Sequence, residues 1–220
     1  MNRVLVVSPH MDDETLGVGG TIVKHVESGD KVKVCFICHR KYDNCFDSTK
    51  NEVEIKHSLN AMNILKYHEV EHLNLEDERL DYAIYKIVEP LTKVALEFKP
   101  DIIYIPSFAD NNQDHRAVFE ACMIVFRSFA ISYQSILSYE VPSSTEQSFP
   151  VQPFLFNPNY YVDIYPFLEK KLSAMSAYET EKREVPHPRS SEAIKILAQK
   201  RGFEVSLKTC EAFIILRYIW

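Results

Sequence analysis

The chain has 220 residues, of which 31 are acidic and 25 are basic, so its formal net charge is −6 with neutral histidines. An acidic balance lacks the excess of lysine and arginine that phosphate backbones attract, which argues against nucleic-acid binding. The hydrophobic content of 46% is ample for a packed core. No apolar run approaches the roughly 18 residues of a membrane-spanning helix, so we predict no membrane span.

The cysteine count and the first residues bear on the cellular compartment. Five cysteines without regular spacing favour reduced thiols over a disulfide scaffold. The polar residues from Ser8 onward follow the first apolar run too soon for a secretory signal. We therefore expect a cytoplasmic protein, and we assign residues 1–220 to a single domain.

Short apolar runs alternate with helical periodicities through the first two-thirds of the chain. Strands are expected at residues 4–7, 31–37, 70–75 and 102–105, and helices at 15–27, 51–67, 81–98 and 115–129. This alternation predicts an α/β fold, a Rossmann-like open and mostly parallel sheet with helices on both faces.

The last third of the chain has a different composition, because seven of the eleven prolines lie from Pro142 onward. We predict an irregular, proline-rich segment at about residues 142–166. Two further helices at 167–178 and 191–201 and a final strand at 213–219 follow. Glycine is scarce, yet three of the five glycines fall at positions 17, 19 and 20, which predicts a close backbone approach there.

A histidine and an acidic cluster, His10-Met11-Asp12-Asp13-Glu14, come directly after the first predicted strand. In an open α/β sheet this position faces the crevice outside the carboxyl ends of the strands, where ligands bind. His10 and Asp13 lie three residues apart, so a turn that enters a helix can point both at one ion. An imidazole with a carboxylate suits Zn²⁺, and iron(II) accepts the same ligands.

A catalytic zinc needs a third protein ligand, which should come from another strand end. His115 is the natural candidate, because it opens a helix after the strand predicted at 102–105. Asp12 is not needed as a ligand and is the candidate general base that takes a proton from the metal's water. Asp114 is expected to cap the helix or to brace His115. These parts together indicate a metal-assisted hydrolase.

At these positions the chain resembles the PIG-L/LmbE-type zinc-dependent N-deacetylases. Their signature is His-Pro-Asp-Asp-Glu followed by Gly-Gly, with a later His-x-Asp-His that opens a helix. This chain has His10-Met11-Asp12-Asp13-Glu14, then Gly19-Gly20, and later Asn112-Gln113-Asp114-His115. The tail from Pro188 to Phe213 is also similar to the family pattern, so the resemblance covers nearly the whole chain.

The resemblance implies an LmbE-like fold, zinc held by His10, Asp13 and His115, and Asp12 as general base. It implies a small-molecule substrate, an N-acetylated amino sugar or its conjugate, often of the GlcNAc type. Side chains that are candidates to contact sugar hydroxyls are Arg40, Tyr139 and Arg189. The identity of the sugar and the oligomeric state, including a homo-oligomer, stay open.

Two residues depart from the family pattern. Met11 replaces the usual proline, which relaxes the turn but removes no functional atom. Asn112 stands where the family has the first histidine of His-x-Asp-His, a residue thought to support the oxyanion or the leaving group. As a candidate catalytic residue, Asn112 can still donate a hydrogen bond to an oxyanion, but it has no titratable proton near neutrality. Losing one such donor costs roughly 10²–10³ in rate.

Two alternatives therefore stay open. One is a catalytically impaired zinc- or sugar-binding module, and the other is an amidase for another N-acyl small molecule. Two further motif matches are rejected. The string His68-Glu69-Val70-Glu71-His72 falls on a predicted strand, where residues four apart stand about 13 Å from each other. The haem-attachment string at 35–39 begins within an apolar strand, whose two thiols would face opposite sides.

Overall fold

The computed structural model describes residues 1–39, 48–78, 80 and 83–220. Its centre is a seven-stranded sheet in the order β3-β2-β1-β4-β5-β7-β6. The first five strands of this order are parallel, and β7 runs antiparallel to both β5 and β6. The strands are β1 Arg3–Ser8, β2 Lys31–His39, β3 Glu69–Glu76, β4 Ile102–Pro106, β5 Ser135–Tyr139, β6 Tyr160–Asp163 and β7 Cys210–Tyr218. The predicted open, mostly parallel sheet is confirmed.

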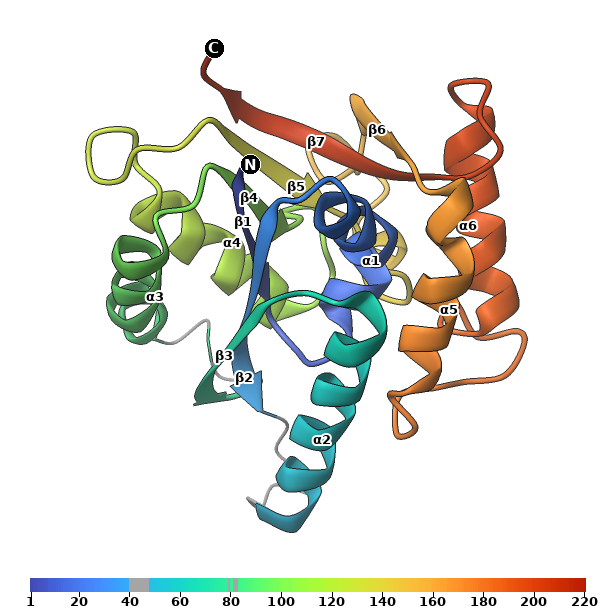
Figure 1. The fold of residues 1–220 in the computed structure, drawn as a ribbon, viewed down its shortest axis with the longest axis horizontal. Helices are drawn as coiled ribbons and strands as arrows, with labels where there is room; N and C mark the ends of the chain where they lie inside the picture. The colour runs from blue at the N-terminus through green and yellow to red at the C-terminus, as the bar shows by residue number, and fades with distance from the viewer. Residues whose placement is uncertain (40–47, 79, 81–82) are drawn as a thin grey trace.

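Helices cover both faces of the sheet and make three layers (Figure 1). One face carries α1, α2, α5 and α6, and the other carries α3 and α4. The helices are α1 Asp13–Glu27, α2 Ser48–Leu65, α3 Ile84–Phe98, α4 Gln113–Val125, α5 Leu168–Ser176 and α6 Ser191–Phe203. Two short 3₁₀ turns, Thr145–Gln147 and Tyr165–Phe167, lie in the last third.

The first strand shows why the sheet needs helices on both sides. Val4 and Val6 belong to the core under α1, whereas Leu5 and Val7 belong to the core under α3 and α4. All four are fully buried. Because successive side chains of a strand point to opposite faces, a continuous apolar run is stable only between two helical layers.

The glycines at the start of α1 allow the close approach that the sequence predicts. A Cβ on Gly17 would collide with the ring of Tyr139 in β5, and a Cβ on Gly20 would lie 2.7 Å from Ile164 Cβ. A buried ion pair fixes the same stretch from the other side. Lys171 Nζ donates to Leu16 O at 2.7 Å and to Glu211 at 2.6 Å, and Glu211 accepts from the Gly20 and Thr21 backbone N–H groups.

Several predicted boundaries differ from the structure. Two strands were not expected, β5 and β6, and β6 lies inside the segment predicted to be irregular. β6 has only four residues, and it exists because β7 supplies a hydrogen-bonding edge. Helix α4 ends at Val125 and not at residue 129. Cys35 and Cys38 belong to the same core cluster, under α3 and α4, so the expectation that these thiols face opposite sides is wrong.

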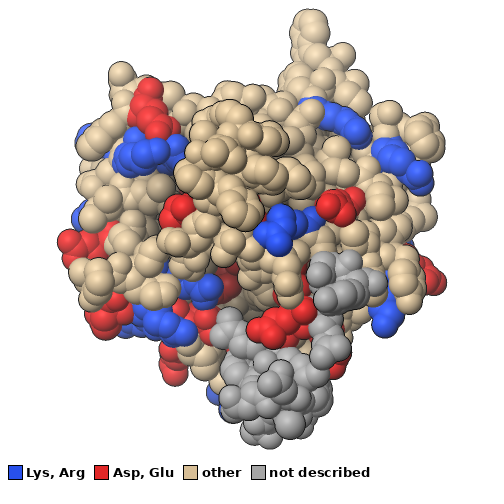
Figure 2. Space-filling model, turned by 180° about the vertical axis from the view of Figure 1, so that it is seen from behind, with Lys and Arg blue, Asp and Glu red and all other residues tan. Residues whose placement is uncertain are grey.

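On the face shown in Figure 2, lysine, arginine and acidic side chains are interspersed over the part of the chain that the structure describes. This agrees with the mixed, mildly acidic composition. Among the described helices, none combines the length and the apolar character that a bilayer crossing needs.

Candidate metal centre

The loops that follow β1 and β4 form the centre. β1 pairs in parallel with β2 on one side and with β4 on the other. The chain leaves β1 toward β2, and β4 continues toward β5, so the connections diverge between β1 and β4. This divergence leaves a crevice at the carboxyl ends of the two strands. Residues 9–12 lead into α1 and residues 107–112 lead into α4, so both loops meet there.

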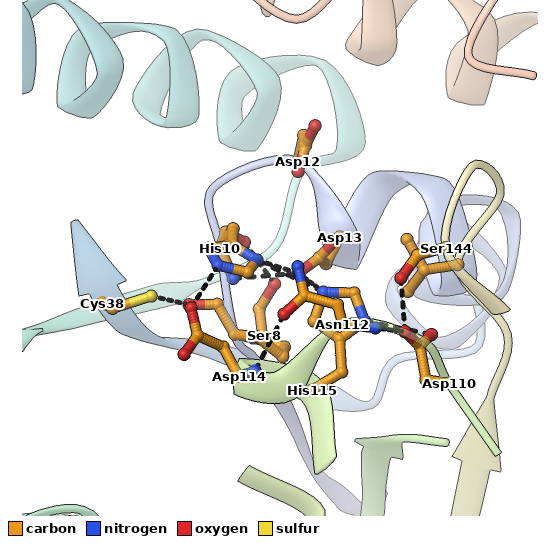
Figure 3. Close-up of polar contacts among 12 residues, drawn as sticks. Ser8, His10, Asp12, Asp13, Cys38, Asp110, Asn112, Asp114, His115 and Ser144 are labelled. Carbon is orange, nitrogen blue, oxygen red and sulfur yellow. Dashed lines mark hydrogen bonds and ion pairs between the residues drawn. The ribbon is translucent and has the colours of Figure 1, made fainter. Parts of the chain in front are cut away.

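Three side chains converge in this crevice, and they are the predicted ligands His10, Asp13 and His115 (Figure 3). His10 Nδ1 lies 3.2 Å from Asp13 Oδ2 and 3.2 Å from His115 Nε2. Asp13 Oδ2 and His115 Nε2 are 3.3 Å apart. Tetrahedral ligands at about 2.0 Å from zinc stand about 3.3 Å from one another. The three atoms therefore fit three corners of a zinc tetrahedron.

The charges at the centre favour a cation. Burial alone would lower the pKa of His115, but the carboxylates of Asp13 and Asp110 outweigh it and raise that pKa to about 9. Burial would raise the pKa of Asp13, yet the neighbouring His115 and His10 hold it well below its usual range. The fold thus stabilises positive charge among these side chains, which a proton or a metal ion supplies.

Each candidate histidine ligand contacts a second carboxylate through its other ring nitrogen. Asp114 Oδ2 lies 3.2 Å from His10 Nε2, and Asp110 Oδ2 lies 3.1 Å from His115 Nδ1. Carboxylates in this position fix the tautomer and the ring direction of metal-bound histidines. The sequence-based expectation that Asp114 braces His115 is therefore wrong, because Asp114 reaches His10 and Asp110 takes the other role.

Asp110 was not singled out from the sequence, and its support comes from a distant loop. Its carboxylate accepts a hydrogen bond from Ser144 Oγ (Figure 3). It also accepts one from Thr145 Oγ1 at 2.6 Å. Asp110 Oδ1 also accepts from Asn112 N at 2.8 Å. The run of Asp110, Asn111 and Asn112 before His115 was a visible signal of a polar loop, but only the fold brings residues 144 and 145 to it.

Asn112 is the N-cap of α4, because its side-chain oxygen accepts from Asp114 N at 2.8 Å. Asparagine is among the preferred N-cap residues, whereas Asp114 lies inside the helix and does not cap it. With its oxygen committed to the cap, the amide NH₂ of Asn112 is the end that remains to donate to a ligand. Asn112 lines the same pocket as His10.

Asp12 lies on the loop between the candidate ligands His10 and Asp13, and its carboxylate is drawn apart from the network of dashed contacts (Figure 3). Its backbone has φ 138°, a region that non-glycine residues rarely adopt. Arg189 Nη1 donates to Asp12 Oδ2 at 3.0 Å and to Glu181 Oε2 at 2.6 Å, and Arg189 Nε donates to Ser143 Oγ at 2.8 Å. Arg189 therefore ties Asp12 to two segments of the last third of the chain.

Glu14 anchors the end of the motif inside the protein. Its carboxylate accepts from the Tyr178 hydroxyl at 2.7 Å, and its backbone N–H donates to Ser8 Oγ at 3.0 Å. Burial raises the pKa of Glu14 to about 7. Glu14 thus ties the loop after β1 to Tyr178, just beyond α5.

A pocket of about 460 Å³ opens beside the centre. His10 and a set of acidic, amide and arginine side chains line it, among them Asp12, Asn112, Asp114 and Arg189. The candidate general base, the candidate oxyanion donor and one candidate metal ligand therefore face one space.

Tyr139, one of the three predicted sugar contacts, does not line this pocket. Tyr139 is fully buried, its hydroxyl donates to Val7 O at 2.8 Å, and its ring packs on Gly17, so the structure places it in the core. Arg40 lies outside the described residues. Of the three predicted contacts, only Arg189 lies at the pocket among the described residues.

A second group of potential ligand atoms shares His10 with the first and adds Cys38 and Asp114. Burial raises the pKa of the Cys38 thiol to about 11, and Cys38 Sγ donates to Pro9 O at 2.9 Å. A thiol that stays protonated is a poor metal ligand. The group of His10, Asp13 and His115 is therefore the better cation site.

The fold and the site define an α/β protein with a His-Asp-His centre at a switch point of its sheet. Residues 5–126 match the family model of PIG-L, described as GlcNAc-PI de-N-acetylase. The chain belongs to the PIG-L family.

Two curated relatives and one solved structure illustrate the likeness. The chain is 30% identical to the uncharacterized deacetylase YaiS of Escherichia coli K12 over 156 residues, which covers 69% of this chain and 80% of YaiS. It is 29% identical to the diacetylchitobiose deacetylase of Thermococcus kodakarensis over 198 residues, 82% of this chain and 70% of that protein. The N,N'-diacetylchitobiose deacetylase structure from Pyrococcus horikoshii superposes with a TM-score of 0.79 at 21% identity, covering 98% and 84% of the two chains.

Proposed function

We propose that the protein is a zinc-dependent hydrolase that removes the acetyl group from an N-acetylated amino sugar or its conjugate, of the GlcNAc type. One observation carries the proposal: His10, Asp13 and His115 meet at 3.2–3.3 Å beside a pocket that Asp12 also lines. Membership of the PIG-L family and the deacetylase names of its relatives support the choice of reaction. Iron(II) is the alternative metal, because it accepts the same ligands.

His10, Asp13 and His115 would hold the ion. The residues around them would then have to transfer the proton and orient the reacting groups. A bound zinc ion supplies a Lewis acid that polarises a carbonyl oxygen and lowers the pKa of water to about 7. Asp12 takes the proton from the attacking water, since it lines the pocket between His10 and Asp13, whereas the other pocket-lining carboxylate beside a ligand, Asp114, is engaged by His10 Nε2. Arg189 fixes the direction of the Asp12 carboxylate through its bond at 3.0 Å.

Asn112 supplies the hydrogen bond to the oxyanion. The cap to Asp114 N holds its side chain in one orientation, so the NH₂ group is fixed at the pocket wall. Because an amide does not titrate near neutrality, Asn112 cannot protonate the leaving amine. Asp12, having accepted a proton, is the group that returns it to the amine.

The test is acetate release from N-acetylglucosamine and N,N'-diacetylchitobiose by the zinc-loaded protein. Asp12→Asn should lower the rate by about 10²–10⁴-fold and leave the zinc content at one ion per chain. Full activity in Asp12→Asn would reject Asp12 as the base. The Asn112→His variant separates the impaired-module alternative, because a large rate gain would show that the missing donor limits turnover.

The same assay separates the second alternative, an amidase for another N-acyl small molecule. A panel of N-acetylated amino acids and polyamines next to the two sugars compares kcat/KM values. Preference for a non-sugar amide would support the proposed hydrolase reaction but would reject an amino sugar as the substrate. A cytoplasmic location stays part of the proposal, supported by four buried cysteines that are free in the described residues.

A further inference from the structure

A second cavity, of about 380 Å³, lies at the opposite end of the sheet from the metal centre. The C-terminal half of α1 covers it, and β4, β5, β6 and β7 form its floor and walls. Asp30, just before β2, and Ile102 and Ser135, the first residues of β4 and β5, line it. The metal centre follows the other ends of β1 and β4. Since a strand rises about 3.3 Å per residue, roughly a whole strand length separates the two spaces.

A hydrogen-bonded chain of three side chains is built into the wall. Asp30 Oδ2 lies 2.8 Å from His25 Nδ1, and His25 Nε2 lies 3.0 Å from the Tyr104 hydroxyl. Burial lowers the pKa of His25, so the imidazole is neutral at pH 7 and one nitrogen must accept. The Asp30 carboxylate accepts a hydrogen bond from His25 Nδ1–H, and His25 Nε2 accepts one from the Tyr104 hydroxyl. The Tyr104 oxygen keeps its lone pairs for a further donor.

Thr21 adds an independent sign of a ligand. It is 1% exposed and lines the cavity, yet its Oγ1 has no hydrogen-bond partner among the residues that the structure describes. Its backbone N–H donates to Glu211 Oε2 at 2.7 Å, which holds this turn of α1 in place. A buried hydroxyl left without a partner is costly, so a ligand hydroxyl beside it would be stabilised.

The rest of the lining selects for ring shape and for neutrality. Tyr160 and Tyr218 line the cavity and are 43% and 57% exposed, so part of each aromatic ring is accessible to a ligand ring. The charged side chains of the lining are Lys24 and Asp30, one of each sign, and Asp30 is already engaged by His25. Hydroxyl or amide groups of Thr21, Gln134 and Ser135 surround the space. A ligand with several hydroxyl groups satisfies more of them than a phenol with one.

We propose that this cavity is a non-catalytic binding site for a neutral pyranose sugar, with the sugar ring against the tyrosines and its hydroxyl groups bonded to Thr21 and Tyr104. The site goes beyond the proposed deacetylation, because it shares no lining residue with the metal pocket. It would hold a second sugar unit while the metal centre acts elsewhere on the protein.

The experiment is a titration of the full chain with methyl β-D-glucopyranoside, in which saturation-transfer NMR measures the binding. This probe has no acetamide, so it does not offer the reacting group to the metal pocket. Thr21→Val keeps the shape of the side chain and removes only the unpartnered hydroxyl. We expect the variant to weaken binding by about fivefold or more, the usual effect of one hydrogen bond. Its Tm and acetate release should match or exceed those of the wild type.

The Asp12→Asn variant is the control for the other pocket, and it should bind the glucoside as the wild type does. Three results would overturn the proposal. They are no saturation transfer, equal affinity in Thr21→Val and wild type, and loss of binding in Asp12→Asn. Tyr218→Ala is a second test of binding, because it removes one of the tyrosine rings against which the sugar is proposed to lie. This substitution does not touch the core. Binding of p-cresol that depends on Thr21, without binding of the glucoside, would replace the sugar by a phenol.

Discussion

The two ends of helix α1 lie beside polar clusters that differ in their charge balance. At its start, three buried aspartates contact two histidines: Asp13 lies against both His10 and His115, Asp114 against His10 and Asp110 against His115. At its far end, a single aspartate, one histidine and one tyrosine satisfy one another in a line. The first arrangement needs added positive charge, and the second is complete without it. The proposed metal site rests on the first arrangement and the proposed neutral-ligand site on the second.

The largest effect that sharpens this contrast is loss of the metal. His115→Ala removes one of three converging ligands, so we expect zinc stoichiometry to fall from about one to near zero and acetate release to vanish. Metal analysis after gel filtration measures it. His72→Ala is the matched control, because His72 belongs to the rejected zinc-protease string and contacts Ser58 in place of the centre. An unchanged zinc content in His115→Ala would contradict the assignment of His115 as a metal ligand at the start of α1.

The next effect concerns the oxyanion donor. Asn112→Ser keeps a side-chain oxygen that caps α4 but removes the amide NH₂, so we expect kcat to fall by about 10²–10³-fold. Zinc content and Tm should stay close to the wild type. Steady-state kinetics with N,N'-diacetylchitobiose measures the change. If the lower rate is explained by a lower Tm, that is, by a smaller folded fraction, Asn112 serves only as the cap of α4.

A smaller effect is expected from the carboxylates behind the histidines. Asp114→Asn weakens the contact that orients His10, so zinc affinity should drop by about 10–100-fold. Competition with a chromogenic chelator measures the affinity. Asp110→Asn is the paired variant on His115, and it should behave in the same way. If both variants bind zinc as tightly as the wild type, the carboxylates serve the fold and not the metal.

The smallest effect lies at the neutral end and concerns acid stability. The pKa of His25 is lowered by burial below its unfolded value of about 6.5. Its stabilising contribution is therefore complete above about pH 6.5 and is lost as the pH falls through the lowered pKa. Asp30 also has a lowered pKa, through hydrogen bonds from Asn2 and His25 that outweigh burial, and it acts only at still lower pH. Lys24 is the other charge at this cavity.

His25→Asn cannot take up this proton, so its Tm should fall less steeply than that of the wild type between pH 7 and pH 5. Thermal melts of both proteins after chelation measure the difference without a contribution from bound metal. Parallel Tm curves for the two proteins would show that His25 does not titrate in this range. Zinc binding by His25→Asn should equal that of the wild type, which keeps the two ends separate.

The sequence indicated the strands β1, β2, β3, β4 and β7 and missed β5 and β6. Strands such as β1 are continuous apolar runs bounded by polar residues, so their pattern alone identifies them. β5, with the sequence SILSY, and β6, with YYVD, are short and partly polar. They are strands because β7 and β4 offer partners, and a partner from a distant part of the chain leaves no local pattern.

Sequence alone determined the candidate ligands His10, Asp13 and His115, since two loops that follow neighbouring parallel strands must meet at one edge of the sheet. Only the tertiary structure decided which carboxylate stands behind each histidine and that Arg189 reaches Asp12 across 177 positions of the chain. It also decided that Tyr139 is core and that α1 ends over a second cavity. The reason is physical: a motif fixes contacts within a turn or between adjacent strand ends, whereas long-range contacts depend on how whole layers pack.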